Sequence, residues 1–171
     1  KPGAKIGTGS PRRIAQLKKL YPQAEIVPIR GNIDTRISKV ESGQYDAIVL
    51  AVAGLEALGL QDKITKTFTI REMFPAVGQG VIALQTRKKS SASNLLSTSS
   101  DPDTYKCAMA ERKMLEVING DCHTAVGCIS SIVGDYLMME AHNFETDKYS
   151  EVIGKKENYI ELGEQLGTKL I

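Results

Sequence analysis

A cysteine in a short loop is the first residue whose type and position suggest chemistry. Cys122 stands in residues 119–123 (Asn-Gly-Asp-Cys-His), between an expected helix at 104–118 and an apolar run at 126–133. We expect Gly120 to end that helix, because glycine takes a positive φ without a steric penalty. A thiol in such a loop can reach solvent, so Cys122 is either an ordinary turn residue or the anchor of a bound group.

Two turns that carry arginine form the second set of candidate functional residues. They are residues 7–13 (Gly-Thr-Gly-Ser-Pro-Arg-Arg) and residues 30–36 (Arg-Gly-Asn-Ile-Asp-Thr-Arg). Each should lie where a strand ends and a helix begins, and helix N-termini and arginine side chains both bind anions. The first turn lacks the third glycine of a dinucleotide loop and the Gly-Lys-Ser/Thr of a P-loop. The pattern therefore favours carboxylates over a nucleotide pyrophosphate.

Apolar periodicity and the glycine and proline breakers predict the elements that position these turns. Strands and helices alternate, at residues 5–9, 11–21, 24–29, 33–42, 45–52 and 53–60. Ser10 suits the N-cap of the first helix, and Pro11 suits its first position. This alternation predicts an open α/β sheet, in which ligands bind at the carboxyl ends of the strands.

The rest of the chain predicts a different architecture. Residues 61–74 are a short strand or pack beneath a loop, 75–80 a hinge or crossover, 81–85 a strand and 87–100 a weak helix. A helix at 104–118, capped by Asp101 or Asp103, precedes strands at 129–133, 136–141 and 149–155 and a terminal helix at 157–171. We predict an α/β lobe like half of a periplasmic binding protein (1–76), a crossover and return segment (77–100) and a small α+β domain with a three-stranded sheet (101–171).

Charge and composition narrow the function classes. The net charge is +2, but residues 1–40 carry nine Lys and Arg against two acids, whereas residues 101–171 carry seven against thirteen. The basic part suggests an anionic ligand, and nucleic acid is a weaker candidate because Tyr21 is the only aromatic there. Three cysteines and two histidines give neither an even disulfide set nor a metal-binding spacing. With no recognisable signal or membrane-spanning run, a cytoplasmic location is expected.

Several motifs, taken in order, resemble those of the porphobilinogen deaminase (hydroxymethylbilane synthase) family. They are the two turns at residues 7–13 and 30–36, residues 45–51 (Tyr-Asp-Ala-Ile-Val-Leu-Ala), 53–55 (Ala-Gly-Leu) and 75–80 (Pro-Ala-Val-Gly-Gln-Gly), and Glu111-Arg112 ahead of Gly120-Asp121-Cys122. The resemblance covers nearly the whole chain. It implies a transferase of haem and tetrapyrrole biosynthesis that joins four porphobilinogen molecules into linear hydroxymethylbilane with loss of ammonia.

The resemblance also implies roles for residues. A dipyrromethane cofactor would be bound to Cys122 through a thioether and held by Thr8, Ser10, Arg12, Arg13, Arg36, Val77 and Gly80. Substrate carboxylates would be bound by Arg13, Arg30 and Arg36, with no metal. The family's catalytic aspartate belongs to an N-terminal domain expected before Lys1. No catalytic residue is therefore assigned, and the 171-residue chain alone is expected to be inactive. The family is usually monomeric and binds neither nucleic acid nor membranes.

Four positions depart from the family pattern. Asp121 and Ala125 replace a small residue and a proline in the cysteine loop, and Glu56 and Ala57 stand where a basic residue often follows Ala-Gly-Leu. On the residues alone, two other functions remain open: a non-catalytic α/β module that binds a small dicarboxylate, and a nucleic-acid-binding domain. An adduct on Cys122 would favour the enzyme, because a binding module needs no thiol there.

Overall fold

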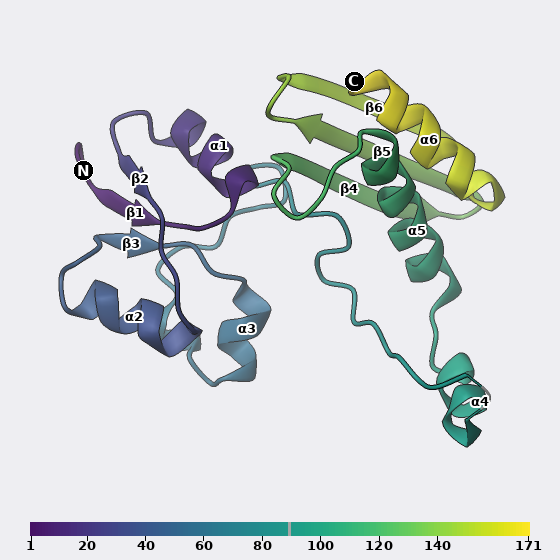
Figure 1. Cartoon of the computed structure of the whole chain (residues 1–171), viewed down its shortest axis with the longest axis horizontal. Helices are drawn as coiled ribbons and strands as arrows, with labels where there is room; N and C mark the ends of the chain where they lie inside the picture. Colours follow the sequence, from purple (N-terminus) through teal and green to yellow (C-terminus); the bar gives the residue numbers. More distant parts are fainter. Residues whose placement is uncertain (89) are drawn as a thin grey trace. The chain divides into compact units, whose positions relative to one another are not determined.

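The chain divides into two compact units, Lys1–Met73 and Phe74–Ile171. We describe a computed structural model, which covers residues 1–88 and 90–171 (Figure 1). Each unit has its own three-stranded sheet. Within the described residues, no helix combines the length and the apolar character needed to cross a membrane.

A parallel sheet forms the centre of the first unit. Its strands are β1 (Lys5–Gly7), β2 (Glu25–Val27) and β3 (Ala47–Ile48), in the order β2-β1-β3. The helices α1 (Pro11–Leu20), α2 (Ile33–Glu41) and α3 (Val52–Ala57) each follow one strand, and a 3-10 turn (Gln61–Lys63) comes after them. The predicted α/β alternation is confirmed. Because all three strands run in one direction, their carboxyl ends meet at one edge of the sheet.

Local sequence explains where α1 begins. The Ser10 side chain accepts a hydrogen bond from the backbone N–H of Arg13, and Pro11 occupies the first turn, as predicted. Leu17 is fully buried on the inner face of the helix. No acidic residue lies in the first turn of α1. The positive end of this helix is therefore not neutralised by an acid within the helix itself.

The predicted strand at 45–52 is much shorter in the structure. Only Ala47–Ile48 is a strand, although Asp46 N and Val49 N still donate to carbonyls of the β1 segment. Strand β3 is short because β1, its only neighbour in the sheet, spans three residues. An apolar run cannot remain a strand where no neighbouring backbone accepts its hydrogen bonds.

The described residues contain neither the strand predicted at 81–85 nor the short strand that was one of the two alternatives for 61–74. Residues 64–70 form a loop in which the Phe68 ring lies against Tyr21, with 6.5 Å between ring centroids. Residues 81–85 are extended but pair with no described strand, and Ile82 and Leu84 are 87% and 60% exposed. Their composition suits a strand, but no backbone hydrogen bond recorded for the described residues joins this segment to β4 or β6, the edge strands of the second unit's sheet.

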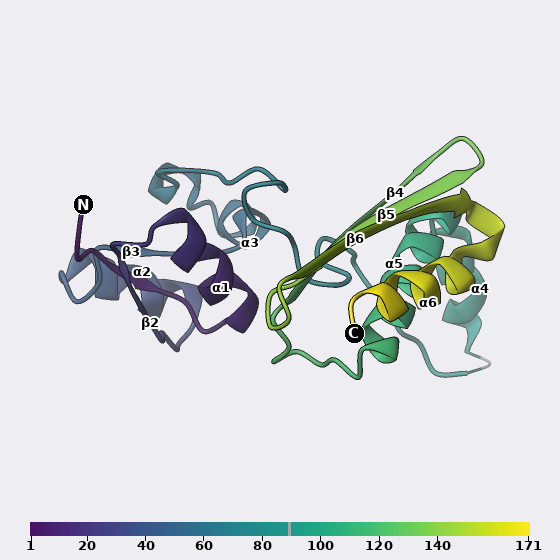
Figure 2. The same ribbon diagram turned by 90° about the horizontal axis from the view of Figure 1, so that it is seen from above.

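The second unit is an antiparallel sheet with helices on one face. Strands β4 (Val126–Val133), β5 (Tyr136–Asn143) and β6 (Lys148–Lys155) lie in that order, and α5 (Pro102–Val117) and α6 (Tyr159–Lys169) cover the same face (Figure 2). Helix α4 (Ser91–Thr98) precedes them, and a 3-10 turn (Lys156–Asn158) leads into α6. The predicted helix, three strands and helix are confirmed. Asp101 caps α5 by accepting a hydrogen bond from Thr104 N at 2.6 Å.

Two glycines let α5 and α6 pack closely over this sheet. A Cβ atom on Gly163 would collide with the carbonyl oxygen of Ala110, and one on Gly167 would lie 2.7 Å from Val117 Cβ. The side chains around this contact are fully buried; they include Met114, Leu137, Leu166 and Leu170. The two glycines therefore allow a short distance between α5 and α6. The packing of the second unit's core depends on this distance.

We expect Gly163→Ala to lower the free energy of unfolding by about 2 to 3 kcal/mol, because the added methyl group forces the two helices apart. Urea denaturation followed by circular dichroism would measure this loss. Glu164→Ala, at an exposed position of the same helix, is the control and should change stability by less than about 0.5 kcal/mol. Similar losses in both variants would contradict the packing argument.

Candidate functional site

The carboxyl ends of the parallel strands are tied together by backbone hydrogen bonds. Thr8 is 2% exposed, and its N–H donates to Val27 O at 3.0 Å, which joins the end of β1 to that of β2. The Thr8 hydroxyl oxygen accepts a hydrogen bond from Ser10 N at 3.3 Å. Thr8 and Ser10 therefore shape the turn that leads from β1 into α1.

Three arginines gather around this edge. Arg13 Nη1 donates to Val49 O at 2.9 Å, which links α1 to the end of β3, and Arg36 Nε donates to Gly31 O at 2.7 Å. Burial, followed by the positive charge of Arg13, lowers the pKa of Arg12 to about 10. Burial and the charge of Arg36 lower the pKa of Arg13. A positive charge lowers the pKa of another basic group only when the two lie close together, so we call Arg12, Arg13 and Arg36 the arginine cluster.

The arginine cluster is suited to bind an anion from outside the chain. Within residues 1–88 and 90–171, the recorded hydrogen bonds of the Arg13 and Arg36 guanidinium groups go to backbone carbonyls, not to carboxylates. A bound carboxylate would offset the repulsion among the three charges and receive paired N–H bonds. Arg30 is exposed, and no contact recorded for the described residues joins its side chain to the cluster.

The loop of Cys122 begins where α5 ends. Asn119 takes a left-handed conformation with φ 51°. The N–H groups of Asn119 and Gly120 donate to Glu116 O and Leu115 O at 3.0 and 2.9 Å. This pattern is a Schellman motif with asparagine at the left-handed position. The expectation that Gly120 takes the positive φ is therefore wrong. Gly120 lies close to Leu115, because a Cβ there would stand 2.5 Å from Leu115 Cδ1 and that side chain would have to shift.

Side chains within the loop hold the backbone on both sides of Cys122. The Asp121 carboxylate accepts a hydrogen bond from His123 N at 2.7 Å, and the Thr124 hydroxyl oxygen accepts one from Asp121 N at 2.9 Å. Ala125 N donates to Glu145 Oε1 at 2.9 Å, which ties the loop to the chain beyond β5. The departures at Asp121 and Ala125 thus coincide with hydrogen bonds that fix the loop. Glu56 and Ala57, the other departures, are exposed at the end of α3.

Cys122 differs from the other two cysteines in its exposure. Cys122 is exposed, Cys107 is half-buried and Cys128 is 1% exposed. Burial raises the pKa of Cys107, and it raises the pKa of Cys128 well above the usual value. Because the thiolate is the nucleophilic form, Cys107 and Cys128 are poorly reactive. Cys122 is the cysteine that a reagent in solution can reach.

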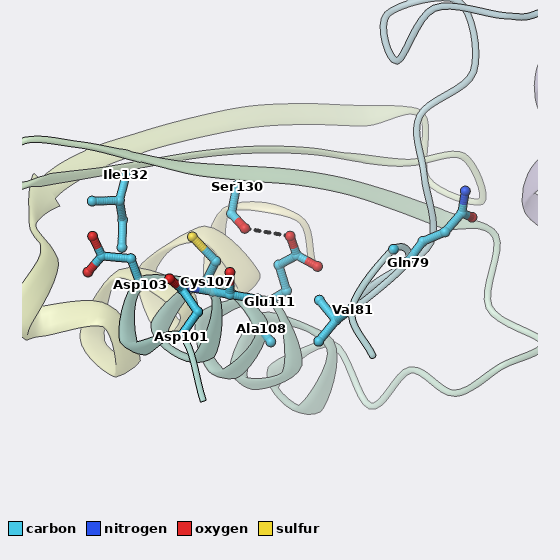
Figure 3. Close-up of a pocket in the computed structure, with 11 residues that line it drawn as sticks. Gln79, Val81, Asp101, Asp103, Cys107, Ala108, Glu111, Ser130 and Ile132 are labelled. Atoms are coloured by element: carbon cyan, nitrogen blue, oxygen red, sulfur yellow. Dashed lines mark hydrogen bonds between the residues drawn. The ribbon is translucent and has the colours of Figure 1, made fainter. Parts of the chain in front are cut away.

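A buried carboxylate, Glu111 of the Glu111-Arg112 motif, lies in the second unit, and its role was not predicted from the sequence. Glu111 lines a hollow of about 370 Å³ together with Cys107 and Ser130 (Figure 3). Burial raises the pKa of Glu111, and hydrogen bonds from Gly78 N and Ser130 partly oppose this shift. The sequence could have indicated that this carboxylate is buried, because Glu111 lies between Ala110 and Met114 on the buried face of α5.

The two segments of the second unit that carry predicted site residues both adjoin α5. Val77 packs against the core of this unit, and Gly80, with φ 92°, lines the hollow beside Glu111. Cys122 follows the carboxyl end of the same helix. The structure therefore groups Thr8, Ser10 and the arginine cluster in the first unit, and Val77, Gly80 and Cys122 around α5 in the second.

Comparison with known proteins covers almost the whole chain. Residues 1–94 match the family model described as porphobilinogen deaminase, dipyromethane cofactor binding domain, and residues 105–171 match its C-terminal domain. The chain is 44% identical to a porphobilinogen deaminase of Clostridium kluyveri over 99% of its length and 59% of that protein. It is 42% identical to the enzyme of Clostridium botulinum over 100% of its length, and 38% identical to that of Clostridium acetobutylicum, in both cases over 60% of the relative.

The chain thus spans about three fifths of the length of the relatives it matches. The two matched models follow one another in the order of the two units. The motifs at the strand ends and in the cysteine loop lie within them. On these grounds, the chain belongs to the porphobilinogen deaminase family.

Proposed function

We propose that the chain carries the cofactor and substrate site of a porphobilinogen deaminase. That enzyme joins four porphobilinogen molecules head to tail. Each condensation forms one carbon–carbon bond and releases one ammonia, and a water molecule completes hydroxymethylbilane when the product is released. The observation that carries the proposal is the arginine cluster, in which burial, followed by repulsion from a neighbouring arginine, lowers the pKa of Arg12 and Arg13. The acetate and propionate groups of porphobilinogen are the kind of anion that would relieve this repulsion.

The residues present fit the dipyrromethane named in the family model. Its carboxylates match the arginine cluster, and Cys122 is the exposed thiol to which a thioether can be made. When bound, this group supplies the pyrrole from which the product chain grows. Its remaining contacts are proposed for Thr8, Ser10, Val77 and Gly80.

Substrate carboxylates are assigned to Arg13, Arg30 and Arg36. Arg30 is exposed, so its side chain is accessible to an anion arriving from solvent. Fixed guanidinium groups orient an anionic substrate before reaction, which lowers the entropic part of the barrier. The general acid that the loss of ammonia requires is placed outside these 171 residues. We therefore expect the chain alone to have no turnover.

The proposed organisation has three parts. Residues 1–76 form a lobe like half of a periplasmic binding protein, 77–100 a crossover and return segment, and 101–171 the domain that carries Cys122. The exposure of Ile82 and Leu84 supports the second part, because this apolar extended segment fits the edge of a further sheet. We propose a monomer without nucleic-acid or membrane partners, in a reducing compartment such as the cytoplasm, which suits an exposed thiol.

The test is the mass of a full-length protein, made by joining this chain to the part of the Clostridium kluyveri relative that it does not cover. After incubation with porphobilinogen, intact mass should increase by one dipyrromethane, and peptide mapping should place the addition on Cys122. A folded full-length protein that gains no such mass, or gains it on another residue, would refute the assignment.

A further inference from the structure

The turn between Pro75 and Val81 has a backbone that its own sequence does not fix. Gly78 and Gly80 have φ values of 70° and 92°, and nothing lies within 4 Å of where a Cβ would stand on either. Glycine is therefore needed at both positions for its positive φ and not for lack of space. Glycine is also the most flexible residue of the unfolded chain. An ordered turn at this place therefore depends on the hydrogen bonds that hold it.

These hydrogen bonds come from the turn itself and from two neighbouring elements. Within the turn, Gln79 N donates to Ala76 O at 3.0 Å and Val81 N donates to Gly78 O at 3.2 Å. Cys128 N donates to Pro75 O at 3.0 Å, which ties the start of the turn to β4. Gln79 Oε1 accepts a hydrogen bond from Ala76 N at 3.2 Å within the turn itself. Gly78 N, at its centre, donates to Glu111 Oε2 of α5 at 2.7 Å.

Glu111 joins the turn to two other elements through one carboxylate. While Oε2 accepts from Gly78 N, Oε1 accepts a hydrogen bond from the Ser130 hydroxyl of β4 at 2.5 Å (Figure 3). The side chain is 9% exposed, so these bonds form largely out of water, where a charge-assisted bond is strong. We call this arrangement the Glu111 clamp.

Stability alone does not call for an acid at this position. Glu111 lies on the buried face of α5 beside Ala110 and Met114, where an apolar side chain would avoid the cost of burying a carboxylate. Apolar replacement of a buried charge is often neutral or stabilising. What a carboxylate offers here is two acceptor atoms at a fixed separation, one for the turn and one for β4.

We infer that Glu111 is a positioning residue, which fixes the turn at Gly78 and so places Val77 and Gly80 for the cofactor. The inference rests on the proposed function, because it takes Val77 and Gly80 as cofactor contacts. Both residues lie within two positions of Gly78, so a shift of its backbone moves both. Glu111 itself need not touch the cofactor.

The first experiment measures amide hydrogen exchange in the 171-residue chain, which does not depend on the cofactor. In Glu111→Ala, the amides of residues 78–81 should exchange at least about tenfold faster, as expected for loss of one strong hydrogen bond, while those of β5 and α6 remain unchanged. In Glu111→Gln, the amide oxygen still accepts from Gly78, so exchange should stay within about threefold of the original chain. Glu116→Ala, an exposed change on the same helix, is the matched control.

The second experiment follows the rate at which the full-length protein gains the dipyrromethane mass from porphobilinogen. Glu111→Ala should load about tenfold more slowly, and Glu111→Gln should restore the rate, because only glutamine keeps an acceptor for Gly78 N. If Glu111→Ala does not fold, the loading rates of Ser130→Ala and Glu111→Gln are measured instead. Both keep the bond to Gly78 and should load normally, and slow loading by either would overturn the inference.

The outcomes separate this inference from the proposed function. Unchanged exchange at residues 78–81 in Glu111→Ala would show that the clamp does not hold the turn. Faster exchange with normal loading would show that the turn does not place the cofactor, and either result overturns the inference. A full-length protein that never loads contradicts the proposed function instead, and with it the cofactor role of the turn, whereas the exchange result still decides whether the clamp exists.

Discussion

The full-length protein with Cys122 replaced by serine is expected to carry no dipyrromethane and to show no measurable turnover. A serine hydroxyl is a far weaker nucleophile than a thiol near neutral pH. Neither of the other two cysteines in these 171 residues can take over, because Cys128 is buried and burial raises the pKa of the half-buried Cys107 as well. Intact mass after incubation with porphobilinogen and the release of ammonia measure the two parts of this prediction.

Cys107→Ser is the matched control for this loss. It removes one thiol and leaves the loop of Cys122 intact, so loading and turnover should be those of the original sequence. An adduct that still forms in Cys122→Ser, or one that disappears in Cys107→Ser, would place the attachment elsewhere in the protein. Peptide mapping of the same samples would identify that residue.

Replacement of Arg13 by leucine is expected to lower kcat/KM for porphobilinogen by about 100-fold or more. A hydrogen bond between charged groups contributes about 1.5 to 3 kcal/mol, and a guanidinium makes two such bonds to one carboxylate. A loss near 3 kcal/mol corresponds to a factor of about 100. Steady-state kinetics of the loaded full-length protein would measure it.

Arg13→Leu should cause this loss without destabilising the fold. Burial and the charge of Arg36 lower the pKa of Arg13, which means that its positive charge is unfavourable in the free protein. Removal of the charge relieves this cost, whereas loss of the hydrogen bond to Val49 O opposes the gain, so the melting temperature should change little. Lys18→Leu, at an exposed position in the last turn of the same helix, removes the same charge and should retain full activity. If the two variants are equally active, the arginine cluster does not bind substrate.

The order of helices and strands could be predicted because it is set by local chemistry. Ser10 and Pro11 at the start of α1 and Asp101 at the start of α5 act within their own turns, and the structure confirms them. Strand length could not be predicted, because it depends on a neighbour. Residues 45–52 and 81–85 have the composition of strands, yet the first keeps only two strand residues and the second keeps none.

The candidate site, like the fold, could be predicted only where local sequence or sheet topology determines it. Parallel strands end at one edge of a sheet, so the meeting of Arg13 with Val49 follows from the topology. The role of Glu111 could not be read from the sequence, because its partners Gly78 and Ser130 are 33 and 19 positions away. The left-handed residue after α5 was predicted to be Gly120 but is Asn119, because asparagine also tolerates the left-handed region.

The matches along the chain support the enzyme over a simple dicarboxylate-binding module. A module of that kind would account for the arginine cluster. It would not account for the similarity of residues 105–171, which carry Cys122, to the C-terminal domain of the same family.

The exposed segment at residues 81–85 has a consequence for handling the isolated chain. Val-Ile-Ala-Leu-Gln has no charge and no proline, and it pairs with no described strand, so it is a template for association with the same segment of another molecule. Arg87 and Lys88 follow it after a single residue, Thr86, and oppose such stacking through charge repulsion. Concentrated preparations should consequently aggregate more readily in high salt, where that repulsion is screened, than in dilute buffer.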